Sequence, residues 1–273
     1  MYHAWPKFLL IIFGGSFLSS CAEMACFDPS PGYNMDCASA KADKFNKRYK
    51  EYFQQQEADW RASANRQARK NAVNESNAIV KRGKVYYDQG QYEQAIAEFD
   101  NAIGVNSQSV WAYTFRGEAY KNLGRFDRAL ADFDKALTLD STYAFAYWAR
   151  GELYHFMKNY SRALADYTQA INRNANDARA RNSKAWLLAT APNGAVRNGP
   201  EAVRLATEAV RLNDHAYYRD TLAAAYAENG QFSKAIEEMQ RAIRMQRETG
   251  DLSRISEFNT HLQLFEQRQP YRE

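Results

Sequence analysis

Three glycines, Gly83, Gly117 and Gly151, lie 34 residues apart, and the residues around each of them are alike. An arginine directly precedes each glycine, and a tyrosine follows three positions after it. A period of 34 residues is the length of two antiparallel helices with their turns, after which the chain returns to the same phase. The sequence therefore predicts an all-α fold, a solenoid in which helix pairs stack side by side.

The other columns of the repeat are small or aromatic. Small residues are expected where the two helices of a unit come closest, and aromatic residues are expected to fill the space between units at the density of a protein interior. These columns are Ala95, Ala129 and Ala163; Ala102, Ala136 and Ala170; Tyr92, Phe126 and Tyr160; and Phe99, Phe133 and Tyr167. Gly90, Gly124 and Gly230 fall where a turn between helices needs a left-handed residue. In the third unit Lys158 takes this place, and Asn159 beside it is expected to supply that conformation.

This pattern resembles the tetratricopeptide repeat (TPR). The resemblance implies a right-handed superhelix of antiparallel helix pairs with flanking helices at both ends. About five units are expected over residues 76–249, divided as 76–109, 110–143, 144–177, 178–215 and 216–249. The fourth unit is irregular because the segment from Pro192 to Pro200 lengthens its turn, and residues 250–273 are expected to form a C-terminal capping helix and tail. The ending from Gln269 to Glu273 resembles the terminal module of many bacterial TPR proteins.

Residues 1–20 have the pattern of a signal peptide. Their apolar run from Phe8 to Phe17 is about half as long as the roughly 20 residues of a membrane-spanning helix. The residues from Leu18 to Cys21 resemble the lipobox of bacterial lipoproteins. The resemblance implies that Cys21 is the lipid anchor, and Ala22 after it implies delivery to the outer membrane. Cleavage after Ala22 without lipid attachment is the alternative.

The segment 21–75 is predicted to be a tether loop followed by a polar helix. If Cys21 is acylated, Cys26 and Cys37 remain as a pair that an oxidising periplasm could join in a disulfide. A metal site is the alternative for this pair, but no histidine lies between Cys37 and His155.

From Ala38 to Asn74 the chain lacks glycine and proline, which indicates a long helix. Its aromatic stripe is predicted to pack on the first repeat, while pairing with a second copy or a role as a spacer stays open. The stripe consists of Phe45, Tyr49, Tyr52, Phe53 and Trp60.

In TPR units the first helices line the concave side, so the resemblance implies a groove that holds a protein or peptide segment. The groove positions combine aromatic with charged side chains, which is the composition of a binding hot spot. The predicted partner-binding residues are Lys84, Tyr87, Trp111, Glu118, Lys121, Phe145, Trp148, Glu152, His155, Phe156, Asn182 and Trp186. The alternative is that the aromatic members pack against the terminal helices or one another. Some TPR domains clamp a terminal carboxylate with Lys, Asn and Arg, but Val80, Phe115, Phe145 and Ala149 stand at those places here.

The charges are balanced along the chain. The formal net charge of +4 comes from 36 basic and 32 acidic residues without a block of one sign, so no nucleic-acid partner is expected. Arg82, Arg116 and Arg150 each lie sixteen positions before an acid, and these acids are Glu98, Asp132 and Asp166. Ion pairs within each unit are predicted, worth about 0–1 kcal/mol each if exposed. A phosphate-binding stripe, the alternative, would need arginines without partners.

No catalytic machinery is visible in the sequence. The four histidines have no metal-binding spacing, and there is no glycine-rich phosphate loop or nucleophile turn. Glu152 and His155 are the one acid–base pair to consider, and a spacing of three on a helix is usually accidental. We therefore expect no enzyme activity, no cofactor and no metal.

Together these features predict a non-enzymatic adaptor or scaffold in the bacterial envelope. It would face the periplasm, be anchored to the outer membrane through its N-terminal lipid, and hold a protein or peptide segment in its concave groove. The alternative is a soluble secreted scaffold without a lipid, which assembles with itself as a homodimer through the helix over 38–74. The residues do not identify the partner or the process.

Overall fold

The computed structural model describes residues 35–273, with side chains from residue 43 onward. All regular elements in this part of the chain are α-helices, as the period predicts. The predicted signal peptide, Cys21 and Cys26 lie outside the described residues, and only the backbone of Cys37 is described. The chain divides into two compact units, residues 1–69 and residues 70–273, and each is described by itself.

The first described helix, α2 (Met35–Asp88), is 54 residues long and contributes to both units. No proline interrupts it, so its hydrogen-bonded ladder continues without a break. In the first unit, the aromatic stripe is 43–71% exposed. Its members contact one another, with ring centroids 6.1 Å apart for Phe45 and Tyr49 and 4.6 Å apart for Tyr49 and Phe53. The stripe is thus open to solvent, where we predicted that it would be buried against the first repeat.

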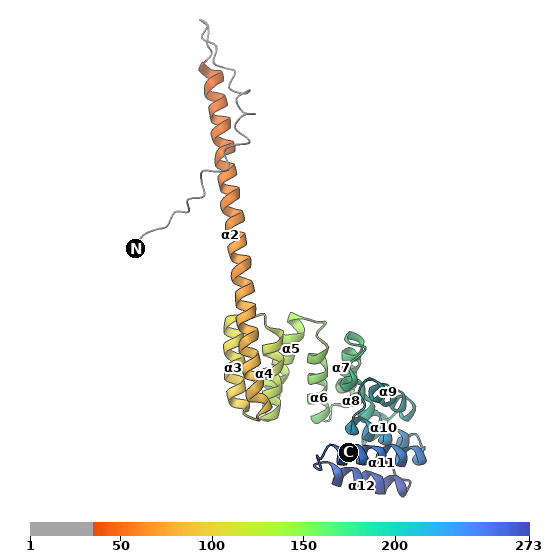
Figure 1. Cartoon of the computed structure of the whole chain (residues 1–273). Coiled ribbons are helices and arrows are strands. Elements are labelled where there is room, and N and C mark those ends of the chain that lie inside the picture. The colour runs from red at the N-terminus through yellow and green to blue at the C-terminus, as the bar shows by residue number, and fades with distance from the viewer. Residues whose placement is uncertain (1–34) are drawn as a thin grey trace. The chain divides into compact units, whose positions relative to one another are not determined.

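The second unit consists of successive antiparallel helix pairs (Figure 1). The end of α2 pairs with α3 (Tyr92–Val105), α4 (Val110–Asn122) with α5 (Phe126–Leu139), and α6 (Ala144–Phe156) with α7 (Tyr160–Arg173). Then α8 (Ala178–Thr190) pairs with α9 (Gly199–Leu212), and α10 (Ala216–Glu228) with α11 (Phe232–Glu248). The last helix, α12 (Ile255–Glu266), packs on α11 and α10.

The glycine column lies at the contact between the two helices of a pair. A Cβ atom on Gly83 would stand 2.6 Å from the ring of Phe99, and one on Gly117 would stand 2.7 Å from Phe133. Only glycine therefore lets the aromatic ring of the second helix lie against the first helix. The column of Phe99, Phe133 and Tyr167 is explained by this contact within a pair, whereas we expected these rings to fill the space between units.

Left-handed residues end the first helices, as the turn positions predict. Gly90, Gly124 and Gly230 have φ of 75°, 71° and 74°. In the third helix pair, Lys158 itself adopts φ 59°, whereas we expected Asn159 to take the left-handed conformation. Asn159 instead begins α7, and its side chain accepts a hydrogen bond from the Arg162 backbone nitrogen. Its role as the N-cap of the next helix fixes it outside the left-handed region.

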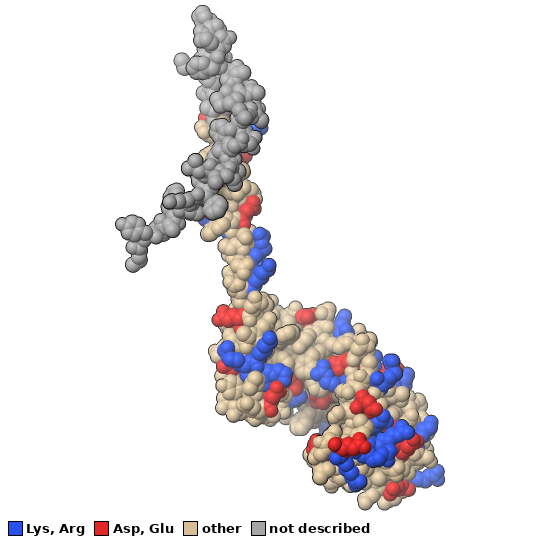
Figure 2. All heavy atoms as spheres, in the orientation of Figure 1, with Lys and Arg blue, Asp and Glu red and all other residues tan. Residues whose placement is uncertain are grey.

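The predicted arginine ladder is present and extends further than expected. The Arg116 guanidinium donates to both carboxylate oxygens of Asp132, at 2.8 and 2.7 Å, and also to Asp100 of the preceding pair. Arg150 repeats the arrangement with Asp166 at 2.8 Å and Asp134 at 2.6 Å. Each arginine therefore ties its own helix pair to the one before it (the charges of one face are shown in Figure 2).

A continuous apolar core joins the last five helices. Phe258 and Phe265 of α12 are fully buried against residues of α10 and α11. A buried polar contact holds the same helix, since His261 Nδ1 and Asp220 Oδ1 of α10 are 2.8 Å apart. Burial raises the pKa of Asp220 above its ordinary value, although the hydrogen bond to His261 acts in the opposite direction. The capping helix is thus fixed to the last repeat by packing and by one buried pair.

Candidate functional site

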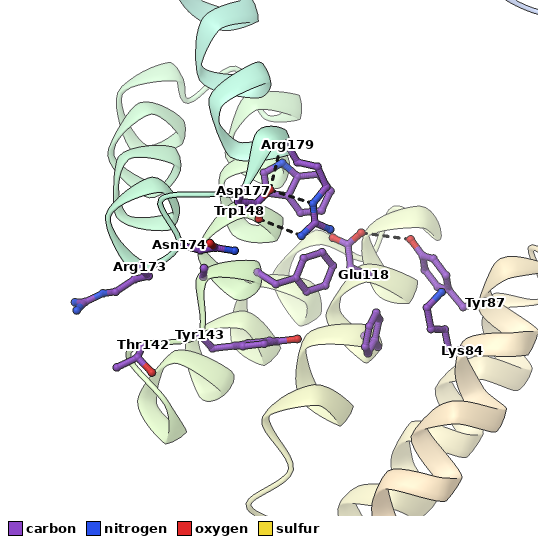
Figure 3. A pocket seen from close by; sticks show the side chains of 13 residues that line it. Lys84, Tyr87, Glu118, Thr142, Tyr143, Trp148, Arg173, Asn174, Asp177 and Arg179 are labelled. Atoms are coloured by element: carbon purple, nitrogen blue, oxygen red, sulfur yellow. Dashed lines mark hydrogen bonds and ion pairs between the residues drawn. The ribbon is translucent and has the colours of Figure 1, made fainter. Parts of the chain in front are cut away.

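An open cavity of about 690 Å³ lies between the first helices of the first three pairs and the start of α8 (Figure 3). Thirteen residues line it, and none of them comes from the C-terminal tail. They are Lys84, Tyr87, Phe115, Glu118, Thr142, Tyr143, Ala144, Phe145, Trp148, Arg173, Asn174, Asp177 and Arg179.

A row of three aromatic rings in contact forms one wall of this cavity. The ring centroids of Phe115 and Phe145 are 5.6 Å apart, and those of Phe145 and Trp148 are 5.3 Å apart. The Arg179 guanidinium lies over this row, 5.0 Å from the centroid of Phe145 and 5.2 Å from that of Trp148. A salt bridge of 3.0 Å to Asp177 holds the arginine there, although its side chain remains 49% exposed. The row therefore offers flat apolar area beside an accessible cation, a combination that favours aromatic and acidic groups.

The opposite end of the cavity is polar. Glu118 accepts hydrogen bonds from Lys121, at 2.8 Å, and from the Tyr87 hydroxyl, at 3.3 Å. Burial and the charge of Glu118 raise the pKa of Tyr87 above its usual range, so its hydroxyl stays protonated. Burial also raises the pKa of Tyr143 to about 12. Both phenols are thus protonated, and the proton of Tyr87 is donated to Glu118.

A second cavity of about 640 Å³ begins at the turn after α4 and ends at the C-terminal tail. Its lining residues are Lys121, Asn122, Gly124, Phe126, Glu152, His155, Phe156, Lys158, Tyr160, Pro192 and Glu273. The tail is therefore part of the wall of this cavity.

Three residues of the tail hold it in place. The Glu273 carboxylate is hydrogen-bonded to His155 Nε2 at 2.8 Å and accepts from the Trp186 indole nitrogen. The Tyr271 ring packs 4.3 Å from His261 and 5.7 Å from Trp186. Arg272 forms a 2.5 Å salt bridge with Glu228. The tail thus covers Trp186, a residue of α8 that was predicted to face the groove.

Most of the predicted groove residues line one of the two cavities. The first cavity is lined by Lys84, Tyr87, Glu118, Phe145 and Trp148, and the second is lined by Lys121, Glu152, His155 and Phe156. The remaining three lie elsewhere. Trp111 is 47% exposed and lines neither cavity, Asn182 is only 1% exposed and is therefore closed to a partner, and Trp186 is covered by the tail.

The junctions between pairs contribute residues to the first cavity that were not predicted from the sequence. Arg173, Asn174, Asp177 and Arg179 belong to the end of α7, the following turn and the start of α8. Asp177 caps α8 by accepting from the Arg179 backbone nitrogen at 2.9 Å, and an aspartate directly before a helix is a recognisable capping signal. That signal predicts the turn but not the position of Arg179 over the ring row.

Known protein families share the repeat. One TPR repeat profile matches residues 83–124, and two tetratricopeptide repeat profiles match residues 110–143 and residues 146–177 and 216–249. The chain carries tetratricopeptide repeats. The TPR class predicted from the glycine columns is therefore confirmed, and so is the all-α TPR solenoid. No curated protein matches this sequence.

Solved TPR structures share the fold. TTC0263 of Thermus thermophilus is 19% identical, with a TM-score of 0.56 over 68% of this chain and 99% of that one. PilF of Pseudomonas aeruginosa is 18% identical, with a TM-score of 0.54 over 71% of this chain and 93% of that one. MamA from Desulfovibrio magneticus RS-1 is 18% identical, with a TM-score of 0.50 over 63% and 96%. At these identities the likeness concerns the fold alone.

None of the helices in residues 35–273 is both long and apolar enough to span a bilayer. Among the side chains that the structure describes, from residue 43 onward, no three of His, Cys, Asp or Glu gather in a way that could hold a metal ion. The two cavities are thus the candidate sites that the TPR units provide.

Proposed function

We propose that this protein is a non-enzymatic adaptor that holds a segment of a partner protein in the first cavity. The observation that carries the proposal is the ring row of Phe115, Phe145 and Trp148 under Arg179, in a cavity that the protein's own tail leaves open. Tryptophan and arginine are the residues that most often dominate binding energy at protein interfaces. The partner segment would place an apolar or aromatic side chain on the row.

The polar end of the same cavity orients the segment. Hydrogen-bond donors at Tyr143 and the amide of Asn174 suit backbone carbonyls or polar side chains, while the Tyr87 hydroxyl already donates to Glu118. No block of one charge surrounds the row, because Lys84 is paired with Asp88 and Glu118 with Lys121. Affinity would therefore come mainly from apolar contact, and specificity from hydrogen bonds.

Two tryptophans provide a matched test of this cavity. The purified protein would be used to recover partners from envelope extract, and the Trp148→Ala variant is expected to recover at least about tenfold less of the specific partner, as for a hot-spot residue. Trp111→Ala is the control, since Trp111 is exposed but lines neither cavity. Equal recovery by Trp148→Ala and the unchanged protein, with helix content preserved, would remove the basis of the proposal.

We further propose that the adaptor is an outer-membrane lipoprotein that faces the periplasm. The support is the sequence alone, namely the apolar run from Phe8 to Phe17 and the lipobox-like residues that end at Cys21. Palmitate labelling of cells that express the protein tests the anchor, and Cys21→Ala is expected to abolish both the label and the membrane fractionation. Absence of label from the unchanged protein would favour secretion without a lipid.

The exposed stripe of α2 favours self-association as a second candidate function. Phe45, Tyr49 and Tyr52 are spaced by four and three residues, as in the seam of a coiled coil. An antiparallel pairing centred between residues 50 and 51 would set Tyr49 against Tyr52 of the second copy.

Sedimentation measurements distinguish this candidate from a monomeric adaptor. If the stripe forms the dimer contact, Tyr49→Lys is expected to produce monomers at concentrations where the unchanged protein is dimeric. Gln54→Lys is the control, because Gln54 lies nine residues from Phe45 and so on the opposite face of the helix. A monomeric unchanged protein, or a dimer that both substitutions leave intact, would exclude the stripe as the contact.

A further inference from the structure

We propose that His155 and Trp186 form a binding site for the acidic side chain of a partner segment, a site that Glu273 of the chain itself fills in this structure. The inference rests on the proposed adaptor function and assigns the chemistry of a second part of the groove. It concerns the second cavity, whereas the proposed function depends on the ring row of the first.

Two donors from different TPR units converge on one carboxylate. His155 Nε2, on α6, lies 2.8 Å from Glu273 Oε2, and the indole nitrogen of Trp186, on α8, donates to Glu273 Oε1. An indole N–H can only donate, so this position suits an acceptor such as a carboxylate oxygen. Each oxygen of the carboxylate therefore has its own donor.

The histidine is positioned as a cation by groups behind it. The Tyr167 hydroxyl donates to Glu152 at 2.6 Å, which leaves its oxygen free to accept from His155 Nδ1 at 3.4 Å. Both ring nitrogens can then act as donors, as only a protonated imidazole allows. The groups that face the ring are Glu152, Tyr160, Tyr167 and Glu273. Burial disfavours the charge, but Glu273 and Glu152 outweigh it, and the pKa of His155 lies above its ordinary value.

The tail that fills the site is short and outside any helix. Residues 269–273 follow α12 in irregular conformation, and one backbone bond, from the Glu273 nitrogen to the Thr190 carbonyl at 3.1 Å, ties their end to α8. The Glu273 side chain is 26% exposed and lines the second cavity. A segment that lies in this cavity can therefore reach the same two donors by displacing a few side-chain contacts.

The tail also indicates the kind of segment that the site accepts. Tyr271 packs against both Trp186 and His261, and Glu273 follows it by two positions, which in an extended chain places both side chains on one side. The preferred ligand is thus an extended segment with an acidic residue two positions after an aromatic one.

The experiment uses a peptide with the sequence of residues 269–273, acetylated and amidated so that the glutamate side chain is its only carboxylate. Its affinity for the full chain is measured by calorimetry. A Tyr271→Ala, Glu273→Gln variant, whose tail no longer competes, is expected to bind the peptide at least about tenfold more tightly than the unchanged chain. Replacing the peptide's glutamate by glutamine is expected to weaken binding about tenfold, as for a charged hydrogen bond.

Two further substitutions in the same variant locate the site. Adding His155→Ala is expected to weaken binding about tenfold. Adding Val85→Ala, the control, is expected to change it less than about threefold, because Val85 is 56% exposed and lines neither cavity. Equal affinity for the glutamate and glutamine peptides, or no binding to a variant that remains helical, would overturn the proposal.

The two proposals fail separately. Trp148→Ala is expected to leave the affinity for this peptide unchanged, because Trp148 lines the first cavity and not the second. Loss of partner recovery together with unchanged peptide affinity would therefore assign partner binding to the first cavity. Failure of the peptide to bind would refute only the proposed carboxylate site.

Discussion

At the scale of single residues, Arg116 connects two neighbouring helix pairs. It lies in a half-buried position between Asp132 and Asp100, and its hydrogen bond to Asp132 is the main cause that raises its pKa, against the opposing effect of burial. Such a position differs from an exposed surface pair, since removal of the arginine leaves a nearly buried carboxylate without its cation. Removal of Arg116 is therefore expected to lower the free energy of unfolding more than removal of an arginine from an exposed pair.

Arg116→Met is expected to lower the free energy of unfolding by about 2 kcal/mol, because the Asp132 carboxylate keeps its desolvation cost and loses its donors. Urea unfolding followed by circular dichroism measures the change. Arg125→Met is the matched control, since Arg125 pairs with Glu93 in an exposed position, and its removal is expected to cost less than about 1 kcal/mol. Equal losses in the two variants would contradict the role assigned to burial.

The bond between His155 and Glu273 predicts how tail docking depends on pH. The pKa of His155 is raised above 6.5, so its contribution to stability is complete below that value and is lost as the pH rises through the folded-state pKa. Burial raises the pKa of Glu273, but His155 and Trp186 outweigh it and the pKa falls below 4.5. The contribution of Glu273 is therefore complete above 4.5 and is lost as the pH falls further.

The two windows overlap between the ordinary values of 4.5 and 6.5. The difference in melting temperature between the unchanged protein and Glu273→Gln is expected to be greatest in this range and to shrink toward alkaline pH. Thermal unfolding across the pH range measures it. A difference that does not vary with pH would show that the tail is held by Tyr271 and Arg272 and not by the carboxylate.

At the scale of elements, a helix pair is held together where a glycine meets an aromatic ring. Gly117→Ala places a Cβ atom 2.7 Å from Phe133, a ring that is fully buried and cannot withdraw. Overpacking of this kind is expected to cost about 1–3 kcal/mol, measured by urea unfolding. Gly104→Ala is the control, since Gly104 lies in the last turn of α3 with open space around it. There the substitution is expected to stabilise by up to about 1 kcal/mol.

At the scale of the whole molecule, the repeat was predictable because its columns follow steric rules that act within one unit. Gly83, Gly117 and Gly151 revealed the period, and the arginine spacing of sixteen revealed the pairs within units. The bonds from Arg116 to Asp100 and from Arg150 to Asp134 were not predicted, because they depend on how adjacent units stack.

The candidate site was predicted less completely, for a similar reason. Register placed Phe145 and Trp148 in the groove, but the position of Arg179 over their rings depends on the turn between two units. The covering of Trp186 by the tail joins residues 87 positions apart, and no periodic pattern indicates such a contact. Asn182 has the register of a groove residue, yet the stacking of α8 leaves it buried.

The bonds from Arg116 and Arg150 to the preceding helix pair determine which changes in the number of repeats keep the ion pairs intact. Excision of residues 110–143 would bring Arg150 into the place of Arg116, opposite Asp100, with Asp166 still beside it. Duplication of the same segment would supply a new arginine together with both of its acids. A genetic gain or loss of one whole 34-residue unit therefore preserves the bridges of this arginine column, whereas a deletion within the repeats that is not a multiple of 34 residues would shift the arginines out of register with their acids.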